Sequence, residues 1–415
     1  MPKWYVRQSK KPIYSRSDGE EVVVKNKQKQ DFETAVGKLN AAYFFREFTF
    51  STNTFKPNPA KELELADKVV WLDDLMILSQ IKERIAPPNT TADKERKWFA
   101  DEVVKKATRQ MRDTLSYLKT YPKIKVRNNR RHVFNIASAQ VTQMHRIVIY
   151  NAHPLLPSEC ATKKYHRSKT ASVLIHLIHA LAYHAILRTL ITPAEIAEYL
   201  AFREALADRW GEALSKVGEK ALVGQYIRNL PDQEPSAAFE DYVDAVNQQT
   251  EDWDIARLIH LFPARRTTPI KRRKQGYTVL RELAKLYRTD MAEFKKRFAF
   301  NMGKALADES CLPNRFTAST GCGFVFIPLQ RKQLPRRKEF LVTFTELNKY
   351  DQKLDKCIGL TFITEGKGSW CDVQWLPVFF PWKQNAALQE GLDSIKPFRP
   401  VKAHRIERYG LLDLP

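Results

Sequence analysis

The sequence predicts a mixed α/β protein, and three observations carry that prediction. Residues 1–155 combine short apolar runs rich in Val, Ile and Leu, which favour strands, with helical periodicity. Residues 156–310 are mainly helical in pattern and basic, and residues 311–415 return to strands separated by Gly and Pro. Because 415 residues can bury two or three cores, we expect an α/β domain, a helical middle domain and a small C-terminal α/β domain with these boundaries.

A helix and a strand are expected first. Residues 30–42 carry apolar side chains at helical spacing, and Glu33 would lie in the first turn. Residues 43–50 alternate in part between apolar and polar side chains, which favours a strand.

A hairpin is expected next. The runs 63–72 and 75–81 are rich in Val, Ile, Leu and Trp and are too short between breaks for a globular helix. Asp73 and Asp74 supply the turn, although Asp-Gly would indicate one more strongly.

The register of this hairpin brings three polar side chains together. A symmetric turn places Asp67 opposite Gln80 and Leu65 opposite Lys82. Cross-strand partners have Cβ atoms roughly 5 Å apart, and residues two positions apart share a face. We therefore expect Asp67, Gln80 and Lys82 to converge on one face of an otherwise apolar hairpin.

This convergence has two interpretations. Charged groups on a half-buried sheet are costly unless they pair with each other or with a metal, so a structural ion pair is one. In the other, Asp67 binds a divalent cation, and the Gln80 amide oxygen or the Ile81 carbonyl supplies a second ligand. Lys82 would then steady the scissile phosphate or the attacking water. Mg²⁺, or Mn²⁺ in its place, suits such a site.

The spacing of these residues is that of a known motif. Asp67, followed thirteen residues later by Gln80-Ile81-Lys82, resembles the D…(D/E/Q)xK signature of the PD-(D/E)xK restriction-endonuclease-like nuclease superfamily. The Gln variant is closest to the Mrr-like branch. The resemblance covers about residues 25–150 and implies an N-terminal restriction-endonuclease-like α/β core. The chain departs from the full pattern because no Pro precedes Asp67 and a neutral Gln replaces an acid.

The resemblance also implies a Glu on the first helix as a metal ligand. Glu33 is the candidate, and Glu47 and Glu64 are alternatives. The catalytic set implied is Asp67, Gln80, Lys82 and Glu33, with the two acids and the Gln around the metal.

A long helix with a basic side is expected after the hairpin. Residues 92–119 lack Gly and Pro and carry an apolar stripe at steps of three or four. Lys105, Arg109 and Arg112 follow the opposite side, either as an ordinary solvated face or as a row that tracks a nucleic-acid backbone.

The charge of the chain favours a polyanionic partner. Lys and Arg number 69 against 47 Asp and Glu, which gives a formal charge of +22. Basic clusters recur along the chain, and the residues singled out for nucleic-acid contact beyond the helix are Arg130, Arg131, Arg272, Arg273 and Lys274.

Further elements are expected towards the C-terminus. Helices fit residues 192–215, where Thr192 to Glu195 forms a capping box, and also residues 237–246, 253–261 and 277–306. The last hundred residues suggest strands at 321–328 and 340–344, a helix at 347–357 and a hairpin of 360–364 with 370–380.

Several other classes of protein are disfavoured. His176, His179 and His184 would share a broad arc of a helix, but they lack a zinc-motif spacing and lie among core-like residues, so a structural role is preferred. Walker and Rossmann phosphate loops are missing from the sequence. Five scattered cysteines, no run of eighteen apolar residues and no apolar leader indicate a cytoplasmic protein without a membrane span.

The expectation is a metal-dependent nuclease acting on nucleic acid, with DNA as the expected substrate. Family analogy suggests restriction or anti-phage defence. The alternative is an inactive nuclease fold that serves as a nucleic-acid-binding scaffold or sensor with partner proteins. A homodimer would supply the two sites needed to cut both strands, and a defence-system partner could release a silent enzyme.

Overall fold

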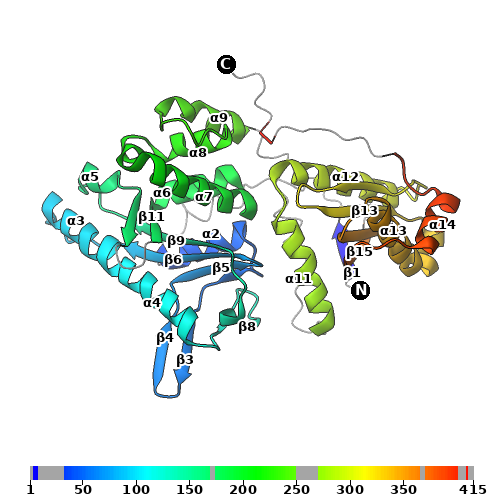
Figure 1. Ribbon diagram of the computed structural model, residues 1–415, viewed down its shortest axis with the longest axis horizontal. Helices are drawn as coiled ribbons and strands as arrows, with labels where there is room; N and C mark the ends of the chain where they lie inside the picture. Colours follow the sequence, from blue (N-terminus) through cyan, green and yellow to red (C-terminus); the bar gives the residue numbers. More distant parts are fainter. Residues whose placement is uncertain are drawn as a thin grey trace. The chain divides into compact units, whose positions relative to one another are not determined.

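The protein consists of two compact units. A computed structural model describes residues 3–7, 32–168, 173–248, 270–364, 370–400 and 408–409. One unit spans Gly19–Thr250, and the other joins Met1–Asp18 to Glu251–Pro415 (Figure 1). The three-part division with boundaries after residues 155 and 310 therefore differs from the observed one. The segment after residue 156 adds strands to the N-terminal sheet, while the helix before residue 310 packs on the C-terminal sheet.

The first unit is built on a six-stranded mixed sheet, which confirms the predicted α/β class. Its strand order is β10-β11-β9-β6-β5-β2, and β6, β9 and β11 run parallel to one another. The strands are β2 (Thr49–Phe50), β5 (Lys68–Leu72), β6 (Leu75–Glu83), β9 (Gln143–Asn151), β10 (Tyr165–Ser168) and β11 (Val173–His179).

Helices cover both faces of this sheet (Figure 1). Residues 92–120 are helical throughout, as predicted, but their middle turns form a π-helix, Phe99–Lys106, between α3 (Ala92–Trp98) and α4 (Ala107–Thr120). The apolar stripe of this helix packs on one face of β6 and β9. The opposite face carries α6 and α7. The remaining helices of the unit are α2 (Phe32–Tyr43), α5 (Ser158–Ala161), α6 (Ala180–Leu190), α7 (Pro193–Trp210), α8 (Glu219–Ile227) and α9 (Glu240–Gln248).

The expected strand 63–72 is confirmed only over Lys68–Leu72, because the chain leaves the sheet before Lys68. β4 (Lys61–Glu64) pairs with β3 (Thr54–Asn58) in a hairpin that projects from the unit, and β5 begins only at Lys68 (Figure 1). Asn53 fixes the break, since its carbonyl accepts the Leu65 N–H at 3.0 Å and its amide donates to the Ala66 carbonyl at 2.9 Å. A second hairpin, β7 (Lys125–Arg127) with β8 (Val133–Asn135), lies beside it.

The expected strand 43–50 is also largely wrong. Only Thr49–Phe50 pair in the sheet, because the chain turns after α2. Phe45 has φ 64°, which no strand residue adopts.

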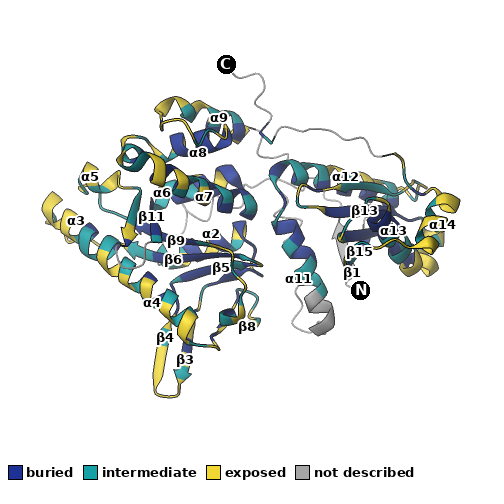
Figure 2. Ribbon diagram, in the orientation of Figure 1, coloured by how far each residue is buried: buried dark blue, intermediate teal, exposed yellow. Residues whose placement is uncertain are grey.

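The second unit is built on a five-stranded sheet of order β1-β15-β14-β13-β12. Its strands are β1 (Lys3–Arg7), β12 (Asn314–Thr317), β13 (Cys322–Pro328), β14 (Lys356–Thr364) and β15 (Trp370–Phe379). Its helices are α11 (Ile270–Ala284), α12 (Arg288–Leu306), α13 (Arg337–Asp351) and α14 (Ala386–Ile395). Figure 2 shows the buried residues concentrated in the sheets and on the helix sides that face them.

The predictions for this unit are confirmed in part. The strand at 321–328 and the hairpin of 360–364 with 370–380 correspond to β13, β14 and β15. The prediction of a strand at 340–344 is wrong, because these residues belong to the helix α13. Phe340 and Phe344 lie one turn apart on it, and their rings stack with centroids 5.8 Å apart. The helix at 347–357 in fact ends at Asp351, since β14 begins at Lys356.

The helices expected in the middle of the chain have shifted bounds. Thr192 caps α7 by accepting the Glu195 N–H at 3.0 Å, as the capping box predicts, and α7 ends at Trp210. The helix at 237–246 corresponds to α9, and the helix at 277–306 is interrupted between α11 and α12. Residues 253–261 lie outside the described residues. Across the described ranges, no helix combines the length and apolar character needed to span a bilayer.

Candidate functional site

The hairpin β5–β6 has the register expected from the sequence. Leu72 pairs with Leu75 across a two-residue turn, and Asp73 takes φ 57° there. Lys68 pairs with Ser79, so the same register continued by one residue sets Asp67 opposite Gln80. The expected pairing of Leu65 with Lys82 is wrong, because β5 begins at Lys68.

Asp67 is held at the edge of β5 by the backbone of β6. Its Oδ2 accepts the Ile81 N–H at 2.6 Å, and its Oδ1 has no hydrogen-bond partner among the described residues. Burial raises the pKa of Asp67 and the negative charge of Glu33 adds to this, while the Ile81 N–H and the Lys82 ammonium oppose it. A carboxylate that is costly to ionise here would be stabilised by a bound cation.

Two more carboxylates lie close to Asp67. Glu64 ends β4, and its pKa is raised by burial and then by the charges of Asp67 and Glu33. Glu33 lies in the first turn of α2, as predicted. Glu47 is engaged elsewhere: it is buried, and its carboxylate accepts from Arg130 Nε at 2.7 Å. Of the alternatives left open by the sequence, Glu33 and Glu64 therefore both act on Asp67 through their charges, although the ligand atoms of the three carboxylates do not all lie within 4.8 Å of one another.

Gln80 presents an unused acceptor beside these acids. Its side chain is 2% exposed, and its Oε1 has no hydrogen-bond partner in the described part of the chain. Leaving a buried acceptor unpaired costs about 1–3 kcal/mol, so nearly all buried acceptors in folded proteins have a partner. A cation held between Asp67 and Gln80 would supply one.

Lys82 reaches the same face of the sheet and is held by α4. Its Nζ donates to Gln110 Oε1 at 2.6 Å. Burial lowers the pKa of Lys82, and the negative charge of Asp67 counteracts this while Lys106 adds to it. Gln110 was not among the residues predicted from the sequence, although a polar residue on the apolar side of an amphipathic helix was a usable signal.

Lys68 was not among the residues predicted from the sequence; it pairs with Ser79, on the face of the hairpin opposite Asp67 and Gln80, and acts on Asp67 through its charge. It is 4% exposed, forms an ion pair with Glu33 and lies 3.5 Å from the Ser51 carbonyl oxygen. Gly37 makes room for it, since a Cβ at that position would lie 3.2 Å from Lys68 Cε. Its position directly after Asp67 was the available signal.

The residues present fit a hard divalent cation. Asp67, Glu64, Glu33 and Gln80 offer carboxylate and amide oxygens, which Mg²⁺ and Mn²⁺ prefer. The orphaned Gln80 oxygen is the observation that supports this fit.

The predicted basic row is only partly available for contact. Lys105 forms an ion pair with Asp101 at 2.9 Å, whereas Arg109 and Arg112 are exposed and form no ion pair within the described chain. Arg130 is bound to Glu47, and Arg131 is exposed. Arg272, Arg273 and Lys274 fall in α11 of the other unit, and their side chains lie outside the described residues.

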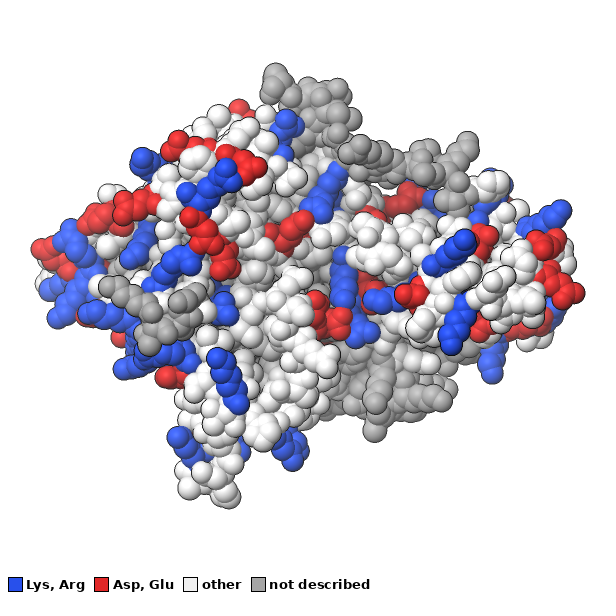
Figure 3. All heavy atoms as spheres, in the orientation of Figure 1, with Lys and Arg blue, Asp and Glu red and all other residues white. Residues whose placement is uncertain are grey.

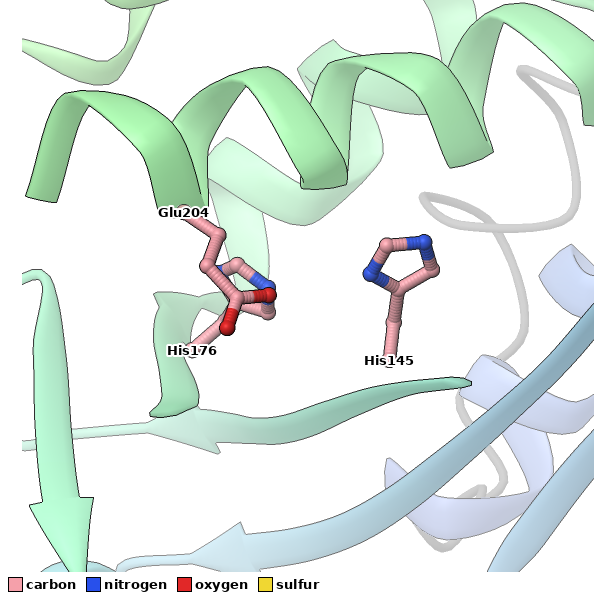
Figure 4. Close-up of side chains that lie close together, drawn as sticks. All are labelled: His145, His176 and Glu204. Carbon is pink, nitrogen blue, oxygen red and sulfur yellow. The ribbon is translucent and has the colours of Figure 1, made fainter. Parts of the chain in front are cut away.

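A histidine cluster lies on the opposite face of the sheet, but it is not the predicted trio. His176 and His179 belong to β11 and His184 to α6, so the expectation of one shared helix is wrong. Instead, ligand-type atoms of His145, His176 and Glu204 lie within 4.8 Å of one another, and the Glu204 carboxylate points from α7 towards the two rings (Figure 4).

The surroundings of this cluster oppose a metal ion. Arg203 is buried, and its Nη1 lies 3.0 Å from His176 Nδ1, where a metal-bound imidazole usually needs an acceptor for its second N–H. The guanidinium of Arg146 adds a second positive charge, which together with burial lowers the pKa of His145 to about 4. The rings of His145 and His176 are therefore buried as neutral imidazoles.

Comparison with known proteins adds no assignment. No family model, no curated protein and no solved structure matches the chain. The chemistry of the site therefore rests on the residues described above.

Proposed function

We propose that the protein is a divalent-cation-dependent nuclease that hydrolyses phosphodiester bonds of DNA. The observation that carries this proposal is the placement of the Asp67 carboxylate, the unpaired Gln80 amide oxygen and the Lys82 ammonium on one face of the hairpin β5–β6. Carboxylates beside a lysine suit phosphoryl chemistry, because they hold the cation while the lysine stabilises negative charge. The D…QxK spacing adds the family resemblance, and a role in restriction or anti-phage defence follows by analogy alone.

Each side chain has a defined part in the proposed reaction. Asp67, Glu64 and Gln80 would hold Mg²⁺ or Mn²⁺, which when bound supplies Lewis acidity and lowers the pKa of water. Lys82 would donate to a non-bridging phosphate oxygen as its negative charge grows during in-line attack by water. Gln110 positions the Lys82 ammonium, and the Ile81 N–H fixes the Asp67 carboxylate.

A nucleic-acid-binding scaffold is the second candidate, and two features favour it. Lys68 already neutralises Glu33, and Gln80 contributes no charge. Both features weaken the hold on a cation relative to a site with a further acid.

A cleavage assay separates the two candidates. Purified protein is incubated with plasmid DNA, linear DNA and RNA in Mg²⁺, Mn²⁺ or EDTA, beside Asp67→Ala and Lys82→Ala. Lys220→Ala, which removes an exposed lysine on the other side of the unit, serves as the matched control. The nuclease proposal expects metal-dependent cleavage that both site variants abolish and the control retains. Cleavage that survives both substitutions would refute the site.

Absence of cleavage by the wild-type protein, with tight and salt-sensitive DNA binding, would favour the scaffold. A nuclease held silent by a partner would give the same result. Toxicity on co-expression with neighbouring genes, lost with Asp67→Ala, would identify that case.

A further inference from the structure

The hairpin β3–β4 projects from the first unit as a two-stranded ribbon (Figure 1). Its strands are mostly exposed, but its base is anchored. Phe55 is 5% exposed, and its ring contacts Tyr117 and Tyr121 with centroid separations of 5.8 Å and 5.6 Å. Edge-to-face aromatic pairs of this kind stabilise a packing arrangement beyond the buried area alone. The ribbon is thus a fixed projection of the fold.

The surface around this ribbon carries unpaired positive charge. Segments 54–64 and 107–135 hold ten Lys and Arg against three Asp and Glu. Nine of the ten are exposed and form no ion pair within the described chain, whereas Arg130 is bound to Glu47. The nine are Lys56, Lys61, Arg109, Arg112, Lys119, Lys123, Lys125, Arg127 and Arg131. Figure 3 shows blue and no red spheres at the end of the hairpin.

The ribbon is continuous with the candidate site. β4 ends at Glu64, and Asp67 follows three residues later, with the intervening backbone fixed by Asn53. The neighbouring hairpin β7–β8 is linked to the same region by a bridge between Thr52 and Arg127. A polymer that binds along the ribbon would therefore extend towards Asp67.

We propose that the β3–β4 hairpin enters the major groove of duplex DNA while the surrounding cations bind its phosphates. The major groove of B-DNA is about 12 Å wide and admits a two-stranded ribbon, whereas the major groove of A-form RNA is deep and narrow. Lys56 and Lys61 lie on the two strands of the ribbon and flank its tip. The inference deepens the proposed function, because it names duplex DNA as the substrate class and the element that recognises it.

Binding without cleavage tests this inference apart from the nuclease activity. Fluorescence anisotropy in EDTA compares duplex DNA, duplex RNA of the same sequence and single-stranded DNA. The variant Lys56→Ala/Lys61→Ala is expected to lose about tenfold in duplex DNA affinity and to lower the salt slope by about 2. The matched control Lys216→Ala/Lys220→Ala removes two exposed lysines near α8 and should stay within twofold of wild type.

Dimethyl sulfate footprinting then locates the groove. Wild-type protein should protect guanine N7, which faces the major groove, and Lys56→Ala/Lys61→Ala should lose that protection. Far-UV circular dichroism checks that the variant folds. Any of four results would overturn the inference. These are equal effects of the two double variants, equal affinity for the RNA duplex, no protection of guanine N7, and no DNA binding at all. Hairpin-dependent binding without cleavage would instead support the hairpin and count only against the nuclease, which the co-expression test then decides, and cleavage with hairpin-independent binding would refute only the hairpin.

Discussion

Acidification should destabilise the first unit because His145 is buried as a neutral ring. Its pKa falls to about 4 through burial and the nearby Arg146 charge, against an ordinary value of 6.5. Between these two pH values the ring binds a proton in the unfolded chain but not in the folded chain. The free energy of unfolding is therefore highest above the ordinary pKa of 6.5, and it falls as the pH is lowered below that value. The linkage relation gives a loss of about 2 kcal/mol between about pH 8 and about pH 5 from this ring alone.

Urea unfolding at the two pH values measures this loss. His145→Leu removes the titrating ring, so its free energy of unfolding should change by about 2 kcal/mol less between the two pH values than that of wild type. Ile147→Val is the control, because it trims the same face of β9 without removing a titratable group. Equal pH dependence in wild type and His145→Leu would refute the assignment of a buried neutral ring.

Three further predictions concern catalysis and the second unit. Because the pKa of Asp67 is raised in the cation-free protein, protons and Mn²⁺ should compete for its carboxylate, so the Mn²⁺ concentration that gives half-maximal cleavage should rise as the pH is lowered, and a metal requirement that does not change with pH would contradict this. Gln110→Leu should lower kcat about tenfold with little change in KM, because Lys82 loses its 2.6 Å partner, and Gln110→Glu should restore most of the rate. Arg337→Met should lower the free energy of unfolding by about 3–5 kcal/mol, because the buried Asp372 loses its 2.8 Å ion pair with the guanidinium, and urea unfolding of the double variant Arg337→Met/Asp372→Asn should recover part of that loss.

The parts of the site that were predictable from the sequence depend on local geometry. A two-residue turn fixes a period-two register, so the positions of Asp67 and Gln80 followed from counting residues along two short strands. The apolar stripe of residues 92–120 was equally local, because helical spacing alone defines the buried side.

The parts that were missed depend on contacts between distant segments. The strand 63–72 was expected to be continuous because its own residues favour a strand. Asn53 instead forms hydrogen bonds with the backbone of Leu65 and Ala66, which interrupts the strand there. Gln110 and Lys68 were missed for the same reason, since their partners lie 28 and 35 residues away along the chain. Apolar or polar character at one position does not reveal which distant group will satisfy it.

The charge balance of the site bears on how the proposed nuclease would hold its cation. Glu33, Glu64 and Asp67 bring three negative charges, and Lys68 and Lys82 bring two positive ones, so the formal charge is −1. An acid at position 80 would make it −2, which is the difference that Gln80 introduces. A single net negative charge attracts a divalent cation only weakly. A substrate phosphate bound at the site would add a second negative charge and strengthen that attraction. On the proposed function, the cation and the DNA would therefore bind cooperatively, and the basic surface around the projecting hairpin would contribute to metal affinity by bringing the phosphate to the site.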